Sequence, residues 1–211
     1  MATSTEPARR GRPPSSQKRA AILEAATSVF LDNGYDRTNL DDVAAVAGVS
    51  KQTVYRHFTD KKSLFMAVVE AAREQQLRPA DAVATVLDPD DLLGSLTRFG
   101  ERMLTVVLSK RVAALRRVMI GELSRIPELR EMWAAGAPTA IATVLITELV
   151  ALTERGVLDV PDPVAAVENY FGLLSFRGMN NTAYGVTELS AKDRKRIAES
   201  AADLFVRAYS R

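Results

Sequence analysis

Four polar side chains lie close together in one short segment and share one side of a predicted helix: Lys51, Gln52, Tyr55 and Arg56. Lysine donates hydrogen bonds to guanine O6 and N7, and glutamine pairs with adenine N6 and N7. Tyr55 lies one turn past Lys51, within reach of a phosphate or a thymine methyl group. Arg56 suits a phosphate or a base edge, and the sequence leaves both open. The types and spacing of these residues predict a surface that contacts double-stranded DNA.

The opposite side of the same helix is apolar and positions that surface. Val54 and Phe58 lie four residues apart, so both can pack against preceding helices. Just before the helix, Gly48 suits a tight turn and Val49 can fill the angle between two helices. Ser50 can cap the helix that follows.

The segment before this turn, residues 40–47, predicts a second short helix. Its apolar residues have the spacing of a core face: Leu40, Val43, Ala44 and Ala47. Thr38 or Asn39 can cap it, and Asp41 and Asp42 favour its N-terminal dipole rather than DNA. Two short helices joined by a Gly-Val-Ser turn are typical of the helix-turn-helix, which lays its second helix in the DNA major groove. An ordinary helical hairpin with a basic outer face is the alternative.

Residues 17–69 closely resemble the DNA-binding domain of the TetR family of bacterial transcription regulators. The resemblance begins with residues 34–38 and with an opening helix whose apolar face holds Ile22, Ala25, Ala26, Val29 and Phe30. It continues through residues 53–58, the family's most recognisable run, to residues 60–64, where the family begins its connecting helix. The resemblance implies an all-α fold, with an N-terminal three-helix helix-turn-helix domain and a C-terminal helical domain for ligand binding and dimerisation.

Four further residues are candidate DNA contacts. His57 matches a family position that usually contacts phosphate, while a buried, hydrogen-bonded ring beside Phe58 is the alternative. Thr53 can offer its methyl group to thymine or its hydroxyl group to phosphate. Thr38 and Lys61 lie at helix starts, where backbone N–H groups already favour phosphate. The whole set predicts a steep fall of DNA affinity with salt.

The chain ahead of the first predicted helix, residues 1–16, lacks a helical period and is expected to be a disordered basic arm. Within it, residues 9–14 resemble the core of an AT-hook, which lies extended in an A·T-rich minor groove. Gly11 lets the backbone approach the groove floor, and Pro13 keeps the chain extended. The arginines suit the negative potential of a narrow groove: Arg9, Arg10 and Arg12. A basic tail that makes unspecific phosphate contacts is the alternative.

The rest of the sequence predicts helices separated by short breaks, with no strand pattern and no internal repeat. The predicted helical segments have these approximate bounds: 64–77, 88–108, 111–125, 127–135, 138–156, 161–184 and 190–211. This gives nine or ten helices in all. We expect a basic arm over 1–16, a helix-turn-helix domain over 17–63, and an effector-binding and dimerisation domain over 64–211.

The family resemblance implies a homodimer, because the last two helices of each TetR-family subunit form a four-helix bundle with those of the partner. Here these helices are residues 163–184 and 190–209. The last one carries an apolar face with several small side chains: Ile197, Ala201, Leu204, Phe205 and Ala208. A core within one subunit is the alternative for this face, and both can hold. Independently, one short helix reads only a few base pairs, so a specific site calls for two half-sites.

Bulky or adaptable side chains on the central helices can line an apolar ligand pocket, although plain core is the alternative for each of them. They are Phe99, Met103, Met119, Leu123, Trp133, Phe171, Phe176 and Met179. Asn180 or Arg177 is the expected polar contact, and an interface carboxylate is the better partner for Arg177. Residues 121–129 resemble the middle of TetR-family effector domains of the type often linked to efflux control.

Composition excludes several classes of function. The chain has no cysteine and one histidine, which excludes disulfides, thiolate metal sites and cysteine nucleophiles. No nucleophile–base pair is visible, so we expect no enzyme, no metal and no cofactor. No run of about 18 apolar residues occurs, which predicts a soluble, cytoplasmic protein with no membrane contact. The family resemblance implies a bacterial protein that is nucleoid-associated when it is bound to DNA. Residues 1–62 hold ten Lys and Arg against seven Asp and Glu, so the excess positive charge lies with the predicted DNA-binding part.

These features favour a homodimeric, sequence-specific repressor that a small apolar ligand releases from a palindromic operator. The alternative is a DNA-binding regulator or architectural protein with no small-molecule input, which acts at A·T-rich sites. A shift in DNA mobility that depends on salt but not on sequence would favour the second.

Overall fold

The computed structural model describes residues 14–76, 87–134 and 139–210 of the 211-residue chain. Over these ranges the fold is all-α, as predicted, with ten helices and no strand. The chain forms two compact units, Met1–Val68 and Val69–Arg211, and α4 continues from one into the other. The division therefore falls a little beyond the boundary expected after residue 63. No helix in the described ranges is long and apolar enough to cross a membrane.

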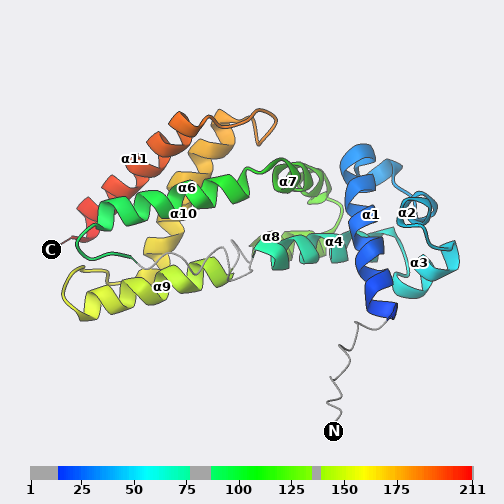
Figure 1. The fold of residues 1–211 in the computed structure, drawn as a ribbon, viewed down its shortest axis with the longest axis horizontal. Coiled ribbons are helices and arrows are strands. Elements are labelled where there is room, and N and C mark those ends of the chain that lie inside the picture. The colour runs from blue at the N-terminus through cyan, green and yellow to red at the C-terminus, as the bar shows by residue number, and fades with distance from the viewer. Residues whose placement is uncertain (1–13, 77–86, 135–138, 211) are drawn as a thin grey trace, which may run out of the picture. The chain divides into compact units, whose positions relative to one another are not determined.

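The N-terminal unit consists of three helices and the start of a fourth (Figure 1): α1 (Pro14–Arg37), α2 (Leu40–Ala47), α3 (Lys51–His57) and α4 (Lys61–Gln76). The buried face of α1 is the predicted one: Ile22, Ala25, Ala26, Val29 and Phe30, each at most 6% exposed. Phe30 packs on Phe65 of α4, with ring centroids 4.8 Å apart. Gly34 has a φ of 74°, which favours glycine, and interrupts the helical backbone near the end of α1.

The C-terminal unit contains the rest of α4 and six further helices (Figure 1): α6 (Leu92–Val107), α7 (Lys110–Glu122), α8 (Pro127–Ala134), α9 (Thr139–Glu154), α10 (Pro163–Asn181) and α11 (Ala191–Tyr209). Within it, α6 packs against α10 and α11. Tyr170 of α10 is fully buried, and its hydroxyl group donates to Leu96 O at 2.7 Å. A Cβ atom on Gly100 would lie 2.8 Å from this hydroxyl oxygen, so glycine permits the close approach of α6 and α10.

Polar side chains cap the starts of three helices, and one helix ends earlier than predicted. Asp91, Asp162 and Ser190 accept hydrogen bonds from backbone N–H groups at the starts of α6, α10 and α11. By contrast, α10 ends at Asn181 and not near residue 184 as predicted. The physical reason is that Ala183 and Tyr184 have positive φ angles of 48° and 59°, which a helix does not tolerate.

Candidate DNA-contacting surface and ligand cavity

The turn between α2 and α3 is built by Gly48 and Ser50. Gly48 has φ 64° and ψ 33°, the left-handed conformation that glycine adopts without a steric penalty. The Val49 N–H group then donates to Ala44 O at 3.1 Å, which satisfies a carbonyl at the end of α2. Ser50 Oγ accepts from the Thr53 N–H group at 3.2 Å and caps α3, as predicted. These bonds determine the direction in which α3 leaves α2.

The helix α3 buries its apolar side and exposes its polar side. Val54 is 0% exposed, and Phe58, which follows the helix, is 5% exposed. The Arg19 guanidinium carbon lies 5.4 Å from the centroid of the Phe58 ring, so α1 covers this end of α3. Four side chains face solvent: Lys51, Gln52, Tyr55 and Arg56. The structure therefore presents together the four side chains with which the sequence predicts base and phosphate contacts.

Lys51 also has a partner within the protein. Its Nζ atom lies 2.5 Å from Asp41 Oδ2, which joins the first turn of α3 to the first turn of α2. The hydrogen bond to Asp41 and the negative charge of that carboxylate raise the pKa of Lys51 above its ordinary value. Both side chains are exposed, so water and salt weaken this pair.

Asn39, and not Thr38, caps α2. Asn39 Oδ1 accepts from the Asp42 N–H group at 2.8 Å, and Asn39 Nδ2 donates to Asp42 Oδ2 at 2.8 Å. Thr38 is only 2% exposed, and its hydroxyl group donates to Gly34 O at 2.7 Å. The Thr38 side chain therefore satisfies a carbonyl inside the N-terminal unit, and its contact with DNA stays a prediction.

Of the other three residues predicted to contact DNA, two make hydrogen bonds within the protein and the third is half-buried. The Thr53 and Ser50 hydroxyl oxygens lie 2.8 Å apart and share a hydrogen bond. Lys61 Nζ donates to Asp36 O at 2.9 Å. His57 is half-buried, with its ring centroid 6.4 Å from that of Phe58, and its Nε2 atom has no hydrogen-bond partner in the described part of the chain. The predicted arm residues Arg9, Arg10, Gly11 and Arg12 lie outside the described residues.

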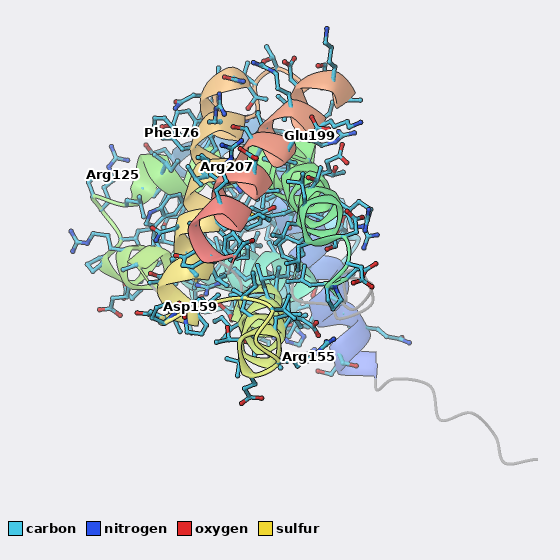
Figure 2. All side chains as sticks on the ribbon, turned by 90° about the vertical axis from the view of Figure 1, so that its left-hand side faces the viewer. Arg125, Arg155, Asp159, Phe176, Glu199 and Arg207 are labelled. Atoms are coloured by element: carbon cyan, nitrogen blue, oxygen red, sulfur yellow. The ribbon has the colours of Figure 1, made fainter. Side chains whose placement is uncertain are left out.

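The outer surface of α10 and α11 is partly apolar. Leu173, Phe176 and Leu204 are 38%, 72% and 51% exposed. Figure 2 shows Phe176 on α10 and Arg207 on α11 at the surface of the C-terminal unit. The predicted apolar face of α11 divides in two, because Ile197, Ala201 and Phe205 are buried in the subunit's own core whereas Leu204 and Ala208 are exposed. Arg177 donates to Ser200 Oγ at 3.0 Å and so has a partner on α11.

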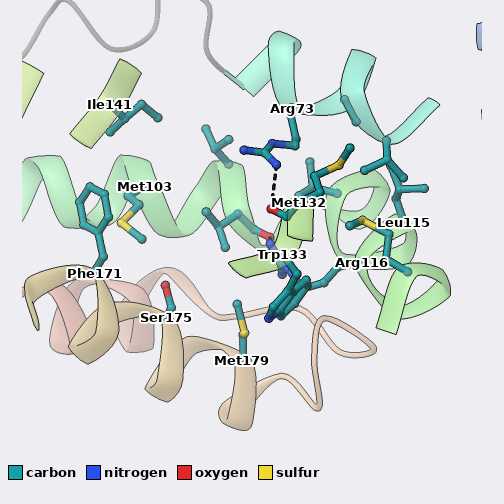
Figure 3. A pocket seen from close by; sticks show the side chains of 16 residues that line it. Arg73, Met103, Leu115, Arg116, Met132, Trp133, Ile141, Phe171, Ser175 and Met179 are labelled. Carbon is teal, nitrogen blue, oxygen red and sulfur yellow. Dashed lines mark hydrogen bonds between the residues drawn. The ribbon is translucent and has the colours of Figure 1, made fainter. Parts of the chain in front are cut away.

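A cavity of about 330 Å³ lies within the C-terminal unit, between the end of α4 and helices α6 to α10 (Figure 3). Five of the predicted pocket residues line it: Met103, Met119, Trp133, Phe171 and Met179. Apolar side chains make up most of the remaining wall. The sequence therefore identifies five of the sixteen residues that surround this space, although it does not identify the space itself.

The other predicted pocket residues lie elsewhere. Phe99 is buried in the core and stacks on Phe171, with ring centroids 6.0 Å apart and an interplanar angle of 11°. Leu123 is half-buried but not in the wall. Phe176 and Asn180 face solvent. Phe176 was expected in the pocket as a bulky residue of the central helices and Asn180 as its polar contact, but a helix exposes different residues on its different sides.

The sequence analysis does not predict three polar residues of the cavity wall: Arg73, Arg116 and Ser175. A signal for Arg116 is present in the sequence. The wall residues of α7 are Val112, Leu115, Arg116 and Met119, which have the spacing of one helical face. An arginine in the middle of an apolar face is therefore the pattern that would have located it.

Two family models match this chain. Residues 22–68 match the model for bacterial regulatory proteins of the TetR family. Residues 94–211 match the model for the C-terminal domain of AefR-like transcriptional repressors. The second match alone covers more than half of the chain.

Individual relatives agree with the family models. The transcriptional activator FasR of Mycolicibacterium smegmatis is 44% identical over 63 residues, a match that spans only 29% of this chain and 29% of FasR. A solved TetR-family regulator from Mesorhizobium loti shares 30% identity at a TM-score of 0.85, over 95% of this chain and 100% of that one. The flavonoid-responsive regulator FrrA shares 25% identity at a TM-score of 0.73, over 92% of this chain and 98% of its own. On this agreement of fold, helix-turn-helix geometry and sequence, the chain belongs to the TetR family of bacterial transcription regulators.

Proposed function

We propose that this protein is a sequence-specific transcriptional repressor whose α3 reads base edges in the major groove of a palindromic operator. The exposed polar side of α3, held by the Gly48 turn and the Ser50 cap, carries the proposal. Lys51 and Gln52 lie in the first turn of α3, where side chains reach base edges first. Tyr55 and Arg56 lie one turn further along and contact phosphates or bases.

The proposed DNA-binding form is a homodimer through α10 and α11. TetR-family regulators dimerise. In this chain, Leu173, Phe176 and Leu204 expose apolar surface on the two helices concerned. Burying such surface against a second copy is favourable. A two-fold dimer presents two copies of α3 to two half-sites, which gives more specificity than one short helix can.

The proposed signal is a small molecule in the cavity of the C-terminal unit. Its volume of about 330 Å³ and its mainly apolar wall suit a small ligand. Among the relatives, FrrA is described as flavonoid-responsive. A ligand releases DNA only if it binds the DNA-incompetent arrangement of the dimer more tightly than the competent one. Repression follows the description of the matched C-terminal domain.

The basic arm is proposed to add contacts in the minor groove beside each half-site. The support is its sequence alone, since residues 9–12 read Arg-Arg-Gly-Arg and two prolines follow. An arginine that enters a narrow A·T-rich minor groove adds affinity through the groove's negative potential.

Footprinting on the DNA that flanks the protein's own gene tests the proposal. We expect a protected two-fold site with half-sites about one helical turn apart. A version that lacks residues 1–14 should protect the same site more weakly and lose its dependence on flanking A·T content. Diffuse protection without a site would contradict the operator proposal and favour an architectural role.

Release is tested on the same operator complex. The complex is titrated with a panel of small apolar compounds that includes a flavonoid, and the bound fraction is followed by anisotropy. A compound that lowers operator affinity while the helical circular dichroism signal stays intact supports the proposed signal. A complex that no compound in the panel affects speaks against it.

A further inference from the structure

The polar part of the cavity wall is entirely cationic or neutral. Of the wall residues that the structure describes, Arg73 and Arg116 are the charged ones, and Ser175 is the third polar side chain. No aspartate or glutamate is among them. The cavity therefore combines an apolar lining with positive charge that no carboxylate of its own wall balances.

Arg116 is the charged wall residue that has an unpaired hydrogen-bond donor. Its Nη2 group donates to Val107 O at 3.0 Å, which anchors the guanidinium between α6 and α7. Its Nη1 atom is buried and makes no hydrogen bond within the described ranges. A buried charged donor without a partner is costly, which is a reason to expect an acceptor there. Burial lowers the pKa of Arg116, although arginine stays charged at neutral pH.

Arg73 is the second charged residue of the cavity wall. Its Nη1 group donates to Met132 O at 2.8 Å, as the dashed line in Figure 3 marks. This bond ties the end of α4 to α8. Figure 3 shows Ser175 and Met179 on α10, across the cavity from Arg73. A ligand in this space thus meets two guanidinium groups together with methionine and aromatic side chains.

We propose that the cavity binds a small amphipathic carboxylate, with its carboxylate group on Arg116 and its apolar body against Met103, Phe171 and Met179. The inference rests on the proposed function in taking this cavity as the ligand site, and it specifies the chemical class of that ligand. A carboxylate supplies the acceptor for Nη1 and one negative charge, and guanidinium matches carboxylate geometry. An amine repels the site, and an alcohol leaves the charge unbalanced.

Direct binding to the full-length protein tests the proposal with three probes of equal chain length: decanoate, decan-1-ol and decylamine. Trp133 lines the cavity and is the only tryptophan of the chain, so its fluorescence reports occupancy of this site. We expect decanoate to bind roughly ten- to hundred-fold more tightly than the alcohol, because a charge-assisted hydrogen bond to a buried group is among the strong ones. Decylamine should bind most weakly.

Two neighbouring arginines of α7 supply a matched pair of variants. Arg116→Met removes the unpaired donor and one of the two charges of the cavity wall, and the preference for decanoate over decan-1-ol should fall below about three-fold. Arg117→Met is the control, because Arg117 is exposed and donates to Tyr184 O outside the cavity wall. Arg116→Lys should keep part of the preference, since the charge remains. Circular dichroism verifies that each variant is folded.

Wild-type protein alone can overturn the inference, whatever the variants do. If decan-1-ol or decylamine binds as tightly as decanoate, or if decanoate does not bind, the carboxylate class is wrong. Operator release is measured separately. Decanoate binding without release would sustain this inference and contradict the release mechanism. Release by an uncharged compound, with no preference for decanoate in binding, would support the release mechanism and contradict this inference.

Discussion

Asp41 holds Lys51 at a distance of 2.5 Å between carboxylate oxygen and ammonium nitrogen. The pair joins the starts of the two helices of the helix-turn-helix. One of the side chains proposed to contact bases is therefore already paired within the protein. DNA must compete with Asp41 for Lys51, and the Asp41 carboxylate also adds negative charge beside the proposed phosphate contacts.

Asp41→Asn is expected to strengthen DNA binding roughly two- to five-fold at low salt, because it releases Lys51 and removes a like charge from the phosphates. The slope of log affinity against log salt should become steeper by about one unit, because the net positive charge of the DNA-binding surface rises by one. Titration of a labelled operator at several salt concentrations measures both. Asp159→Asn, the same charge change in the C-terminal unit, is the control. An unchanged affinity and slope in Asp41→Asn would show that the pair between Asp41 and Lys51 does not weaken DNA binding.

Gln52→Ala should weaken operator binding by about 1–3 kcal/mol and relax the choice of base at one position in each half-site. Binding to random DNA should stay the same, because a base contact adds nothing there. Gln52 is exposed, so folding is unaffected. Gln17→Ala, at an exposed position of α1, is the matched control. An equal loss on random DNA would assign Gln52 to the phosphate backbone instead.

Gly48→Ala should destabilise the protein by about 1–2 kcal/mol through backbone strain alone. Its φ is 64°, but no atom lies within 4 Å of the position that an added Cβ would take, so no steric clash contributes. Gly121→Ala has the same open surroundings without a positive φ, and should stabilise by up to about 1 kcal/mol because it lies in α7. Urea unfolding followed by circular dichroism measures both. Equal effects of the two substitutions would refute the conformational explanation.

Phe176→Glu should dissociate the proposed dimer and leave the fold of each subunit intact. The side chain is 72% exposed in one subunit, so its replacement costs the subunit core little. Burying a charge in an apolar interface is unfavourable. Val186→Glu is the control, since Val186 is 67% exposed but lies between α10 and α11 in sequence and not on either helix. Sedimentation equilibrium measures the oligomeric state of both variants. A Phe176→Glu protein that stays dimeric would show that the dimer interface does not include Phe176.

Tyr170→Phe should lower stability by about 1 kcal/mol at neutral pH, because Leu96 O loses its hydrogen bond from the buried hydroxyl group. Burial raises the pKa of Tyr170 far above its ordinary value of 10.0. The unfolded chain therefore loses this proton first as the pH rises, and stability falls above about pH 10. The variant should lack that part of the fall. Urea midpoints between pH 8 and pH 11 test this, and identical pH dependence in both proteins would exclude Tyr170 as its source.

The helix-turn-helix was predictable because its determinants are local. Gly48 and Ser50 act on backbone groups within a few residues, and the alternation of Val54 and Phe58 with polar neighbours decides which side of α3 is buried. The hydrogen bond of Thr38 was not predictable, for a reason that is also physical. A threonine beside a helix start suits a cap or a phosphate contact, and only its packing against α1 shows that its hydroxyl group bonds to Gly34 O.

The sequence by itself therefore determined the all-α class, the capped helices and the composition of the α3 surface, since periodicity and capping depend on short-range contacts. Only the tertiary structure decided which apolar residues surround a cavity and which face solvent. Phe171 and Phe176 lie on the same helix and look alike in sequence, yet one lines the cavity and the other is 72% exposed. The same holds for Arg116 and Arg117, because the packing of α7 against other helices buries one guanidinium and exposes its neighbour.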